Sequence, residues 1–379
     1  MIIELKGMGT TNKGGYLMLK SVLQVLRQHQ LARELCAETG GGKNYFTLAQ
    51  NGLFQKPAVH ARNYVWHAVL LSLMPKKLRR RFGIILESEV DVILDGSGFG
   101  YGDFWKRSDN KRYIRRIGAV KRKGGPVILL PQALGPFTKP DVREEFEQIV
   151  NQADLIFARD RLSYQYLIDA YGERDCFRTA PDFTNKLVIE APRDYADGNV
   201  CVIPNSKMIT VEKYAGEYVD FLLRAVRQIQ RHERFSPYFL VHEGQKDFAI
   251  CELLNARLDK PLAIVWPADP VEVKDRIRSV HFTLVSRFHG LVSSLSQGVP
   301  AIATSWSHKY RMLMEDYHCE DFLVQIDPAD EKNIASLIDS LANDSQYSAL
   351  KGKLGARSLE QKQRTDAMWA EVLALIERA

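Results

Sequence analysis

The chain has 379 residues, of which 45% are apolar, and a formal net charge of +6. This length exceeds what one hydrophobic core usually supports, so two domains are expected, and the ordinary apolar content argues against extensive disorder. Basic residues are spread along the chain instead of gathering in one arm or tail, which disfavours nucleic acid as a partner.

Signals for a membrane span or a metal site are weak in this sequence. No stretch approaches the roughly 18 consecutive apolar residues of a spanning helix, and the first residues lack the apolar core of a signal peptide. The five cysteines lie far apart without a Cys-x-x-Cys pair, so neither a zinc site nor a disulfide framework is indicated. We therefore expect a cytoplasmic protein without a metal ion.

Short apolar runs alternate with helical patterns along most of the chain, which is typical of parallel strands joined by crossover helices. Strands are predicted in the first half at residues 2–5, 90–94, 127–130 and 155–157. Strands are predicted in the second half at residues 200–203, 238–241, 263–265, 282–285 and 301–304. Apolar residues at helical spacing predict further helices at 218–229, 334–342 and 349–379.

A mixed, charged stretch at residues 186–198 separates the two halves and is predicted to be a linker. We therefore predict an α/β protein with an N-terminal domain at 1–190 and a C-terminal domain at 191–350. The last segment, 351–379, is predicted to be a helix that packs back across the domains. Ligands of such sheets lie beyond the carboxyl ends of the strands, so functional residues are expected in the loops that follow strands.

A glycine-rich loop at residues 6–15 follows the first predicted strand and leads into a helix expected to begin near Tyr16. Its glycines allow a ligand to approach the backbone closely. The loop matches neither a P-loop nor a Gly-x-Gly-x-x-Gly fingerprint. Asn12, Lys13 and Gly14 are candidates for binding an acceptor or a donor, and the alternative is a purely structural turn.

Two further loops, 95–103 and 131–137, follow strands of the first half. Asp103 and Gln132 in these loops are candidates for hydrogen bonds to sugar hydroxyls, and the alternative is a pair of tight turns.

Two arginines stand at the end of the fourth predicted strand, in the segment 158–163. One of Arg159 and Arg161 is expected to reach an anion. The other is expected to form a structural ion pair with Asp160 or Asp182.

The segment 282–309 indicates a strand, a tight polar loop, a helix, a Gly-Val-Pro turn and a second strand. Ser286, Arg287 and His289 precede or open a helix expected at Gly290, so their side chains and the first helical N–H groups can converge on one phosphate or carboxylate. Arginine binds such anions in a bidentate manner, and histidine exchanges a proton near neutral pH. The alternative is that Arg287 pairs with a surface acid and His289 caps the helix.

The next predicted strand ends in Ser-Trp-Ser-His-Lys, at residues 305–309. Neighbouring parallel strands would bring Lys309, and with it His308, to the same edge of the sheet. Lys309 is a candidate for binding an oxyanion of the donor, and the alternative is a solvated surface lysine.

Taken in order, these motifs resemble those of the polysaccharide pyruvyl transferase family. The shared features are Gly-Thr-Thr-Asn-Lys-Gly-Gly, Asp-Gly-Ser-Gly, Pro-Gln-Ala-Leu-Gly-Pro, Ala-Arg-Asp-Arg-Leu-Ser, Ala-Pro-Asp, Ser-Arg-Phe-His-Gly, Gly-Val-Pro and Ser-His-Lys. They span residues 9 to 309, so the match is far more specific than any single motif.

The resemblance implies two Rossmann-like parallel-sheet domains that face a cleft, as in glycosyltransferases of the GT-B type. It implies transfer of pyruvyl from phosphoenolpyruvate, a co-substrate, onto two hydroxyls of a sugar in a surface polysaccharide such as a capsule or exopolysaccharide, without a cofactor. Arg287, His289 and Lys309 fall on the Arg-x-His motif and the lysine that follows it. On this basis His289 is the expected general acid.

The remaining assignments follow from the same interpretation, in which the domain at 1–190 is the expected acceptor side and the domain at 191–350 is the expected donor side. The expected catalytic residues are His289 and Arg287. The expected donor-binding residues are Arg287, Lys309, Ser286, Gly290, Arg159 and His308. The expected acceptor-binding residues are Asn12, Lys13, Gly14, Asp103 and Gln132. The candidates for the base that activates the sugar hydroxyl are Asp103, Asp182 and His308.

Two other functions compete with this one. The first is a glycosyltransferase that uses a nucleotide sugar, although residues 290–300 contain no carboxylate to bind a ribose. The second is a non-catalytic member of an envelope-polysaccharide assembly complex. The segment 60–81, an apolar stretch followed by five basic residues, also suggests contact with the inner face of the membrane, which would favour a lipid-linked oligosaccharide acceptor. The alternative for this segment is a core-facing helix with a solvated basic end.

Overall fold

The computed structural model describes residues 1–31, 34–39, 45–57, 70–104, 110–196, 198–211, 216–326 and 331–379. The chain divides into two compact units. Unit 1 comprises Met1–Thr11, Met18–Phe183 and Thr365–Ala379. Unit 2 comprises Asn12–Leu17 and Thr184–Arg364. The first turn of the first helix therefore groups with unit 2, although it directly follows a strand of unit 1.

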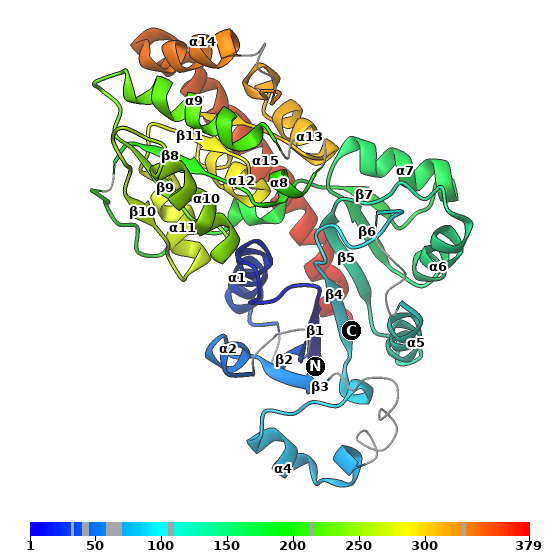
Figure 1. Cartoon of the computed structure of the whole chain (residues 1–379). Coiled ribbons are helices and arrows are strands. Elements are labelled where there is room, and N and C mark those ends of the chain that lie inside the picture. The colour runs from blue at the N-terminus through cyan, green and yellow to red at the C-terminus, as the bar shows by residue number, and fades with distance from the viewer. Residues whose placement is uncertain are drawn as a thin grey trace. The chain divides into compact units, whose positions relative to one another are not determined.

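In the described part of unit 1, seven parallel strands form a sheet in the order β3-β2-β1-β4-β5-β6-β7 (Figure 1). The strands are β1 (Ile2–Lys6), β2 (Glu34–Thr39), β3 (Phe54–Pro57), β4 (Val92–Asp95), β5 (Val127–Gln132), β6 (Leu155–Ala158) and β7 (Phe177–Thr179). The helices include α1 (Lys13–Gln28), α2 (Tyr45–Gln50), α4 (Lys76–Arg81), α5 (Asn110–Lys121), α6 (Pro140–Val150) and α7 (Arg161–Tyr171).

Both faces of this sheet are buried, as expected for parallel strands. On one face, Ile93 and Leu129 join Ile117 of α5 and Phe146 of α6 in one hydrophobic cluster. The alternate strand residues, which point to the opposite face, are also buried.

Five parallel strands form the sheet of unit 2 in its described residues, in the order β10-β9-β8-β11-β12. The strands are β8 (Val200–Ile203), β9 (Pro237–Leu240), β10 (Ile264–Val265), β11 (Phe282–Val285) and β12 (Ala301–Ala303). The helices are α8 (Lys207–Thr210), α9 (Tyr218–Gln230), α10 (Gln245–Asn255), α11 (Pro270–Arg278), α12 (Phe288–Leu295), α13 (His308–Asp316), α14 (Glu331–Ala342) and α15 (Asp344–Glu377), whose last residues belong to unit 1.

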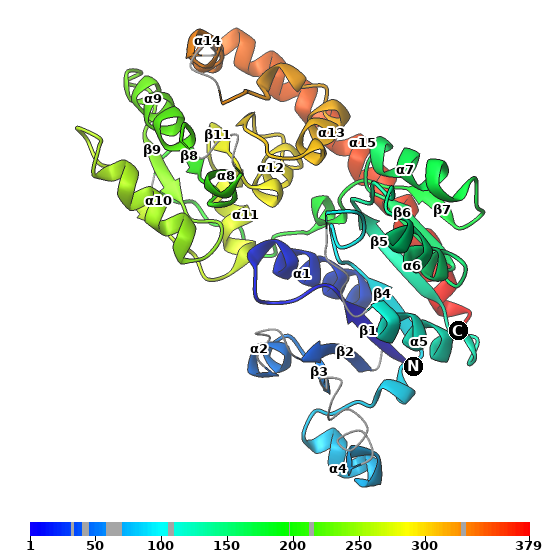
Figure 2. The same ribbon diagram turned by 45° about the vertical axis from the view of Figure 1, so that its right-hand side comes forward.

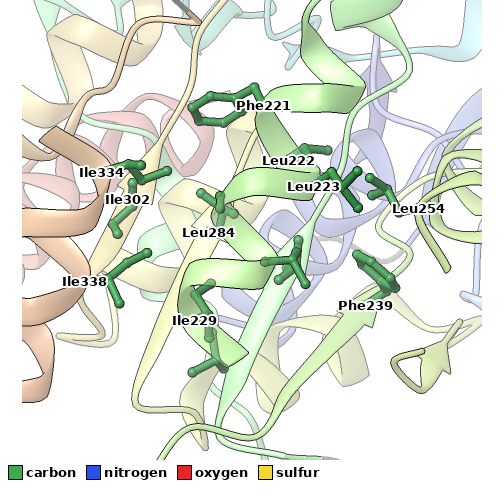
Figure 3. Close-up of a cluster of buried hydrophobic side chains, with 14 of the residues drawn as sticks. Phe221, Leu222, Leu223, Ile229, Phe239, Leu254, Leu284, Ile302, Ile334 and Ile338 are labelled. Carbon is green, nitrogen blue, oxygen red and sulfur yellow. The ribbon is translucent and has the colours of Figure 1, made fainter. Parts of the chain in front are cut away.

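Unit 2 has three layers, with helices on both faces of the sheet (Figure 2). On one face, α9 packs Leu222 and Ile229 against Leu284 of β11, between Leu254 of α10 and Ile338 of α14 (Figure 3). The other face packs against α11, α12 and α13. Because neighbouring strand residues point in opposite directions, each strand contributes to both cores.

The α/β fold predicted from the sequence, with two parallel sheets, is confirmed. All nine predicted strands occur, with bounds that shift by at most two residues. The short strands β2, β3 and β7 were not predicted. The last two helices occur as α14 and α15, and residues 187–196 of the predicted linker form neither helix nor strand.

In each sheet, the first strand of the unit lies in the middle and the chain winds outward in both directions. The order reverses between β1 and β4 in unit 1, and between β8 and β11 in unit 2. Ligands of doubly wound folds bind at the carboxyl ends of the strands that flank such a reversal. In unit 2 this rule selects the loops that follow β8 and β11.

Candidate functional site

Four neighbouring strands of unit 2 end in loops that carry polar side chains. The loops are 204–207 after β8, 241–244 after β9, 286–287 after β11 and 304–307 after β12. Because the strands are parallel, all four loops lie at one edge of the sheet. We call this edge the polar edge of unit 2.

Ser286 connects three of these loops by hydrogen bonds. Its hydroxyl accepts a bond from Tyr218 (2.8 Å) and pairs with the hydroxyl of Thr304 (2.8 Å). Its carbonyl accepts bonds from Asn205 Nδ2 (2.8 Å) and from the Tyr310 hydroxyl (2.9 Å). The side chain of Ser286 is buried and fully engaged in holding the strand ends together. Its role as a donor contact stays a prediction, and the geometry gives it a positioning role.

Arg287 is held by a buried carboxylate on α10. Its Nε donates to Asp247 Oδ2 (2.8 Å) and its Nη2 to Asp247 Oδ1 (2.5 Å), while Ser206 Oγ lies 3.4 Å from Nη2. Solvent does not reach the Asp247 side chain, whereas 19% of the Arg287 side chain is exposed. The acid that pairs with Arg287 is therefore buried rather than at the surface. Among the described residues, Nη1 has no hydrogen-bond partner, so the paired arginine retains a donor for an anion.

The helix that carries His289 begins earlier than the sequence suggested. Arg287 has extended backbone angles and caps α12, so Phe288 opens the helix and His289 lies in its first turn. The expected start of this helix at Gly290 is wrong by two residues. Gly290 lies inside the helix, where its lack of a side chain lets the helix pack against β11. A Cβ on Gly290 would lie 3.0 Å from Val285 Cγ2, so the helix approaches β11 closely.

His289 packs against the first turn of α1. A Cβ on Gly14 would lie 2.5 Å from Nδ1 of His289, which no side chain at this position could satisfy without displacing the ring. The helix α1 begins at Lys13 rather than near Tyr16, because the Asn12 side chain caps it by accepting a bond from Gly15 N (2.6 Å).

The first turn of α1 is also hydrogen-bonded to the loop after β9. Lys13 N donates to both carboxylate oxygens of Glu243 at 3.3 Å, and Lys13 Nζ donates to the carbonyl of Val241 (3.1 Å). Burial lowers the pKa of the Lys13 ammonium and raises the pKa of the Glu243 carboxyl group. Lys13 and Gly14, two of the predicted binding residues, therefore lie at the polar edge of unit 2.

A second histidine, His242, lies in the loop after β9, next to Gly290 of α12. It is buried, and a Cβ on Gly290 would lie 3.5 Å from its ring. Burial, followed by the nearby charges of Arg287, His289 and Lys13, holds its pKa well below the usual value of 6.5. His242 is therefore neutral at physiological pH and adds no charge to the cations around it.

Lys309 stands in the first turn of α13, one residue after His308. Its Nζ lies 4.9 Å from the ring centroid of Trp306 and 5.0 Å from that of Phe288. Phe288 is the residue between Arg287 and His289 in the sequence, so the Lys309 ammonium lies against the first residue of the helix that carries His289. The half-buried Lys309 is held over aromatic rings, which contradicts the alternative of a fully solvated surface lysine.

Three predicted site residues lie in unit 1 and are engaged there. Gln132 is completely buried, with Nε2 3.4 Å from the carbonyl of Asp95. Asp103 accepts bonds from the backbone N–H and the hydroxyl of Thr138 (2.9 and 2.5 Å). Arg159 is the arginine that forms an ion pair, with Asp182 at 3.1 Å, and both side chains are buried. The assignment of these three residues to ligand binding stays a prediction.

Asp247 was not predicted from the sequence, and His242 and Glu243 were also missed. A signal for the last two existed, because they directly follow the strand predicted at 238–241 and sit where ligands of such sheets bind. Asp247 lies within α10, where only the tertiary structure brings it to Arg287.

Metal and membrane signals are absent from the described residues. They contain no group of three histidine, cysteine, aspartate or glutamate side chains arranged to hold a metal ion. None of the helices in the described ranges combines the length and the hydropathy required to cross a bilayer.

The architecture is shared with several solved structures. UDP-GlcNAc 2-epimerase from Neisseria meningitidis, bound to UDP-GlcNAc, is 12% identical with a TM-score of 0.60, over 99% of this chain and 100% of that one. Anabaena HepE in complex with UDP-glucose is 13% identical with a TM-score of 0.57, over 98% and 99%. A glycosyltransferase from Rickettsia africae is 10% identical with a TM-score of 0.59, over 99% and 98%. At these identities the likeness establishes the fold alone.

The fold is that of a two-domain α/β protein of the GT-B type, and the polar edge of its second unit carries an arginine, a histidine and a lysine in the loops and helix starts that follow β11 and β12. The family model for polysaccharide pyruvyl transferases matches residues 12–308, which is most of the chain. The chain belongs to this family. No curated protein sequence matches it.

Proposed function

We propose that this chain transfers the pyruvyl group of phosphoenolpyruvate onto two hydroxyls of a sugar, forming a cyclic ketal and releasing phosphate. The observation that carries the proposal is that Arg287 and His289 begin the helix after β11 at the polar edge of unit 2, and that Lys309 Nζ lies 5.0 Å from the ring centroid of Phe288, the residue between them in the sequence. Family membership supports pyruvylation of a polysaccharide, and the arrangement of these side chains supports the donor.

Phosphoenolpyruvate carries a carboxylate and a phosphate on the same carbon, C2, so its site is expected to offer a cation to each of the two anionic groups. Arg287 offers an oriented guanidinium, because Asp247 fixes two of its nitrogens. Lys309 offers an ammonium whose position is set by the rings of Phe288 and Trp306. We assign these two groups to the two anions of the donor, where they also stabilise the charge that develops on the departing phosphate.

The reaction requires an acid, and we assign this role to His289. Protonation of C3 turns the methylene of the donor into a methyl group and makes C2 electrophilic. The first sugar hydroxyl then attacks C2, the bond from C2 to the phosphate oxygen breaks, and the second hydroxyl closes the ketal. Of the two hydroxyl protons released, one replaces the proton given to C3 and the other leaves with phosphate. No redox partner is needed.

Thermal unfolding in the presence of ligands tests the donor assignment. A ligand that binds only the native state raises its stability by an amount that grows with the logarithm of the ligand concentration divided by Kd. Phosphoenolpyruvate should raise the melting temperature of the wild-type chain, and this shift should disappear in Arg287→Ala. Release of phosphate that depends on an added sugar would demonstrate turnover. Absence of both effects would refute the proposal, and donor binding without any phosphate release would favour a non-catalytic protein.

A nucleotide-sugar glycosyltransferase is the second candidate, because the structures of HepE and of the epimerase contain UDP sugars on the same fold. The segment from Gly290 to Pro300 has no carboxylate that could bind a ribose. A thermal shift with UDP sugars but none with phosphoenolpyruvate would favour this function.

We further propose that the acceptor is a surface glycan or its lipid-linked precursor, modified on the cytoplasmic side of the membrane. Two residues of the basic cluster at 76–81 form ion pairs: Arg79 with Glu89, and Arg80 with both Glu89 and Glu34. The other three basic residues, Lys76, Lys77 and Arg81, are exposed. Residues 60–69 of the suggested membrane segment lie outside the described residues. Vesicles of anionic phospholipid at low salt should retain the protein if this cluster contacts the membrane.

The glycan itself gives a direct test of the reaction class. Mass spectrometry of the surface glycan from cells with and without this protein should show the mass of a pyruvate ketal only when the protein is present. Identical glycan masses would contradict the proposed reaction.

A further inference from the structure

An exposed tryptophan lies at the polar edge of unit 2 and has no part in the donor chemistry. Trp266 directly follows β10, the strand next to β9. Its ring stacks on Phe248 of α10 with centroids 5.2 Å apart and planes at 26°, yet 43% of the residue remains exposed. A large aromatic side chain held in place but open to solvent, at the edge where ligands of this fold bind, indicates a contact surface.

The neighbours of Trp266 are the groups that a sugar requires. Lys13 Nζ lies 6.0 Å from the centroid of the indole ring. Lys13 N also holds the half-buried carboxylate of Glu243, and the next residue, Gly14, packs against His289. The tryptophan, the carboxylate and His289, the proposed acid, therefore all border one turn of α1.

We infer that Trp266, Lys13 and Glu243 form the subsite for the pyranose ring of the acceptor. The C–H bonds on one face of a pyranose carry partial positive charge and stack on the negative face of an indole. A carboxylate accepts hydrogen bonds from neighbouring sugar hydroxyls, and an ammonium group donates to their oxygens. This inference rests on the proposed function, because it takes the acceptor to be a sugar.

The same surface is less suited to a nucleotide. A nucleobase could also stack on Trp266, but its phosphates would then meet the Glu243 carboxylate. A sugar carries no such charge, so the carboxylate beside the indole favours a neutral, hydroxyl-rich ring over a nucleotide.

Binding measurements on the full chain can test the subsite with simple probes. The probes are the methyl pyranosides of galactose, glucose, mannose and N-acetylglucosamine, together with phosphoenolpyruvate and UDP. Saturation-transfer NMR titrations would compare the wild type with Trp266→Ala, Trp266→Phe and Glu243→Gln. The control is Phe46→Ala, which removes an exposed aromatic side chain from α2 in unit 1.

We expect at least one pyranoside to bind the wild type. Trp266→Ala should weaken this binding by about tenfold, which is at the lower end of the loss measured when a nucleobase loses an aromatic stacking partner. Trp266→Phe should weaken it less, because a smaller ring remains. Glu243→Gln should weaken it as well, since a neutral amide is a poorer acceptor of hydrogen bonds than a carboxylate. Phosphoenolpyruvate affinity should be unchanged in both Trp266 variants, and Phe46→Ala should match the wild type.

The inference is overturned if Trp266→Ala binds the sugar as the wild type does, if no pyranoside binds the wild type, or if UDP binds and depends on Trp266. Failure of the proposed donor gives a different result. In that case phosphoenolpyruvate does not bind, while sugar binding still depends on Trp266, and the subsite stands without the donor assignment.

Discussion

Arg287 owes its orientation to a carboxylate that solvent does not reach. In Asp247→Asn, the arginine loses its charged partner and the amide N–H group of the asparagine faces the guanidinium. Removing one member of a buried ion pair leaves the other charge uncompensated, so we expect a loss of about 2–4 kcal/mol in the free energy of unfolding, reduced by the partial exposure of the arginine. Urea denaturation measures this loss.

The matched control is Asp220→Asn, which breaks the exposed pair between Asp220 and Arg257. Exposed pairs contribute about 0–1 kcal/mol, so this variant should unfold close to the wild type. Equal stability of the two variants would show that Asp247 does not hold Arg287 in solution.

His289 differs from the other residues of the polar edge because its predicted role is to transfer a proton. In His289→Asn, turnover should fall by about 10² to 10⁴, the usual contribution of a well-placed general acid, since asparagine cannot exchange a proton near neutral pH. Phosphoenolpyruvate should still bind, because the two cations that hold it are intact. Assays of phosphate release and of thermal shift measure the two effects separately.

His318→Asn provides the comparison for this variant. His318 is an exposed histidine of the same unit with a positive φ of 54°, a conformation that asparagine tolerates well. The His318→Asn variant should retain full turnover. Wild-type turnover in His289→Asn would remove this histidine from the proton transfer.

At the scale of elements, the first turn of α1 is built around the absence of a side chain. Gly14→Ala places a Cβ 2.5 Å from Nδ1 of His289, so the imidazole must shift. A displacement of about 1 Å at a reacting group can cost about 10² in rate, so we expect turnover to fall far more than stability. Steady-state kinetics and urea denaturation of the same preparation test this difference.

Gly352→Ala is the control for the backbone effect of replacing a helical glycine. No atom of the described residues lies within 4 Å of a Cβ at this position of α15. The change should stabilise the chain by about 0.5–1 kcal/mol through helix propensity and leave turnover unaltered. Unchanged turnover in Gly14→Ala would show that the close contact with His289 has no functional role.

The elements that the sequence did not predict lie toward the edges of the sheet in unit 1. Strand β2 contains two partly buried glutamates and strand β3 contains a buried lysine, and these charges conceal the strand pattern. Lys56 of β3 is almost fully buried because it pairs with Glu4 of β1 (2.8 Å), and Arg116 approaches the same carboxylate (3.0 Å). From the sequence, a lysine indicates a surface position, and only the tertiary pairing places it in the interior.

Some residues of the polar edge could be predicted from local sequence patterns, and others depend on tertiary contacts. Arg287 and Lys309 were identified because each follows a strand, a position that local patterns indicate. Asp247 could not be identified, since its role depends on the packing of α10 beside the loop after β11. Lys13 was proposed as a binding residue, but its attachment to Glu243 brings together segments 230 positions apart in the chain.

At the scale of the whole molecule, the two units differ in the groups that titrate on acidification. In unit 1, Asp95 is fully buried and Glu38 is partly buried, and burial alone would raise the pKa of both carboxyl groups. Nearby cations, which include Lys6 for Asp95 and Lys56 for Glu38, outweigh this effect, so both pKa values are lowered. Their stabilising effect is present above the usual carboxyl values and is lost only as pH falls below about 4. In unit 2, burial and nearby cations lower the pKa of His242.

This difference predicts that unit 2 loses stability first when the pH falls from 7.5 to 5.5. The unfolded chain protonates position 242 below about pH 6.5, whereas folded unit 2 keeps this histidine neutral, so each pH unit below that value favours unfolding by up to about 1.4 kcal/mol. Glu243 acts in the opposite direction, because its pKa is raised, so His242→Gln is needed to isolate the histidine. Hydrogen exchange with mass spectrometry, corrected for intrinsic rates, should show reduced protection in β8 and β11 but not in β1 and β4. The loss should shrink in His242→Gln, and an equal loss in both units of the wild type would contradict this account.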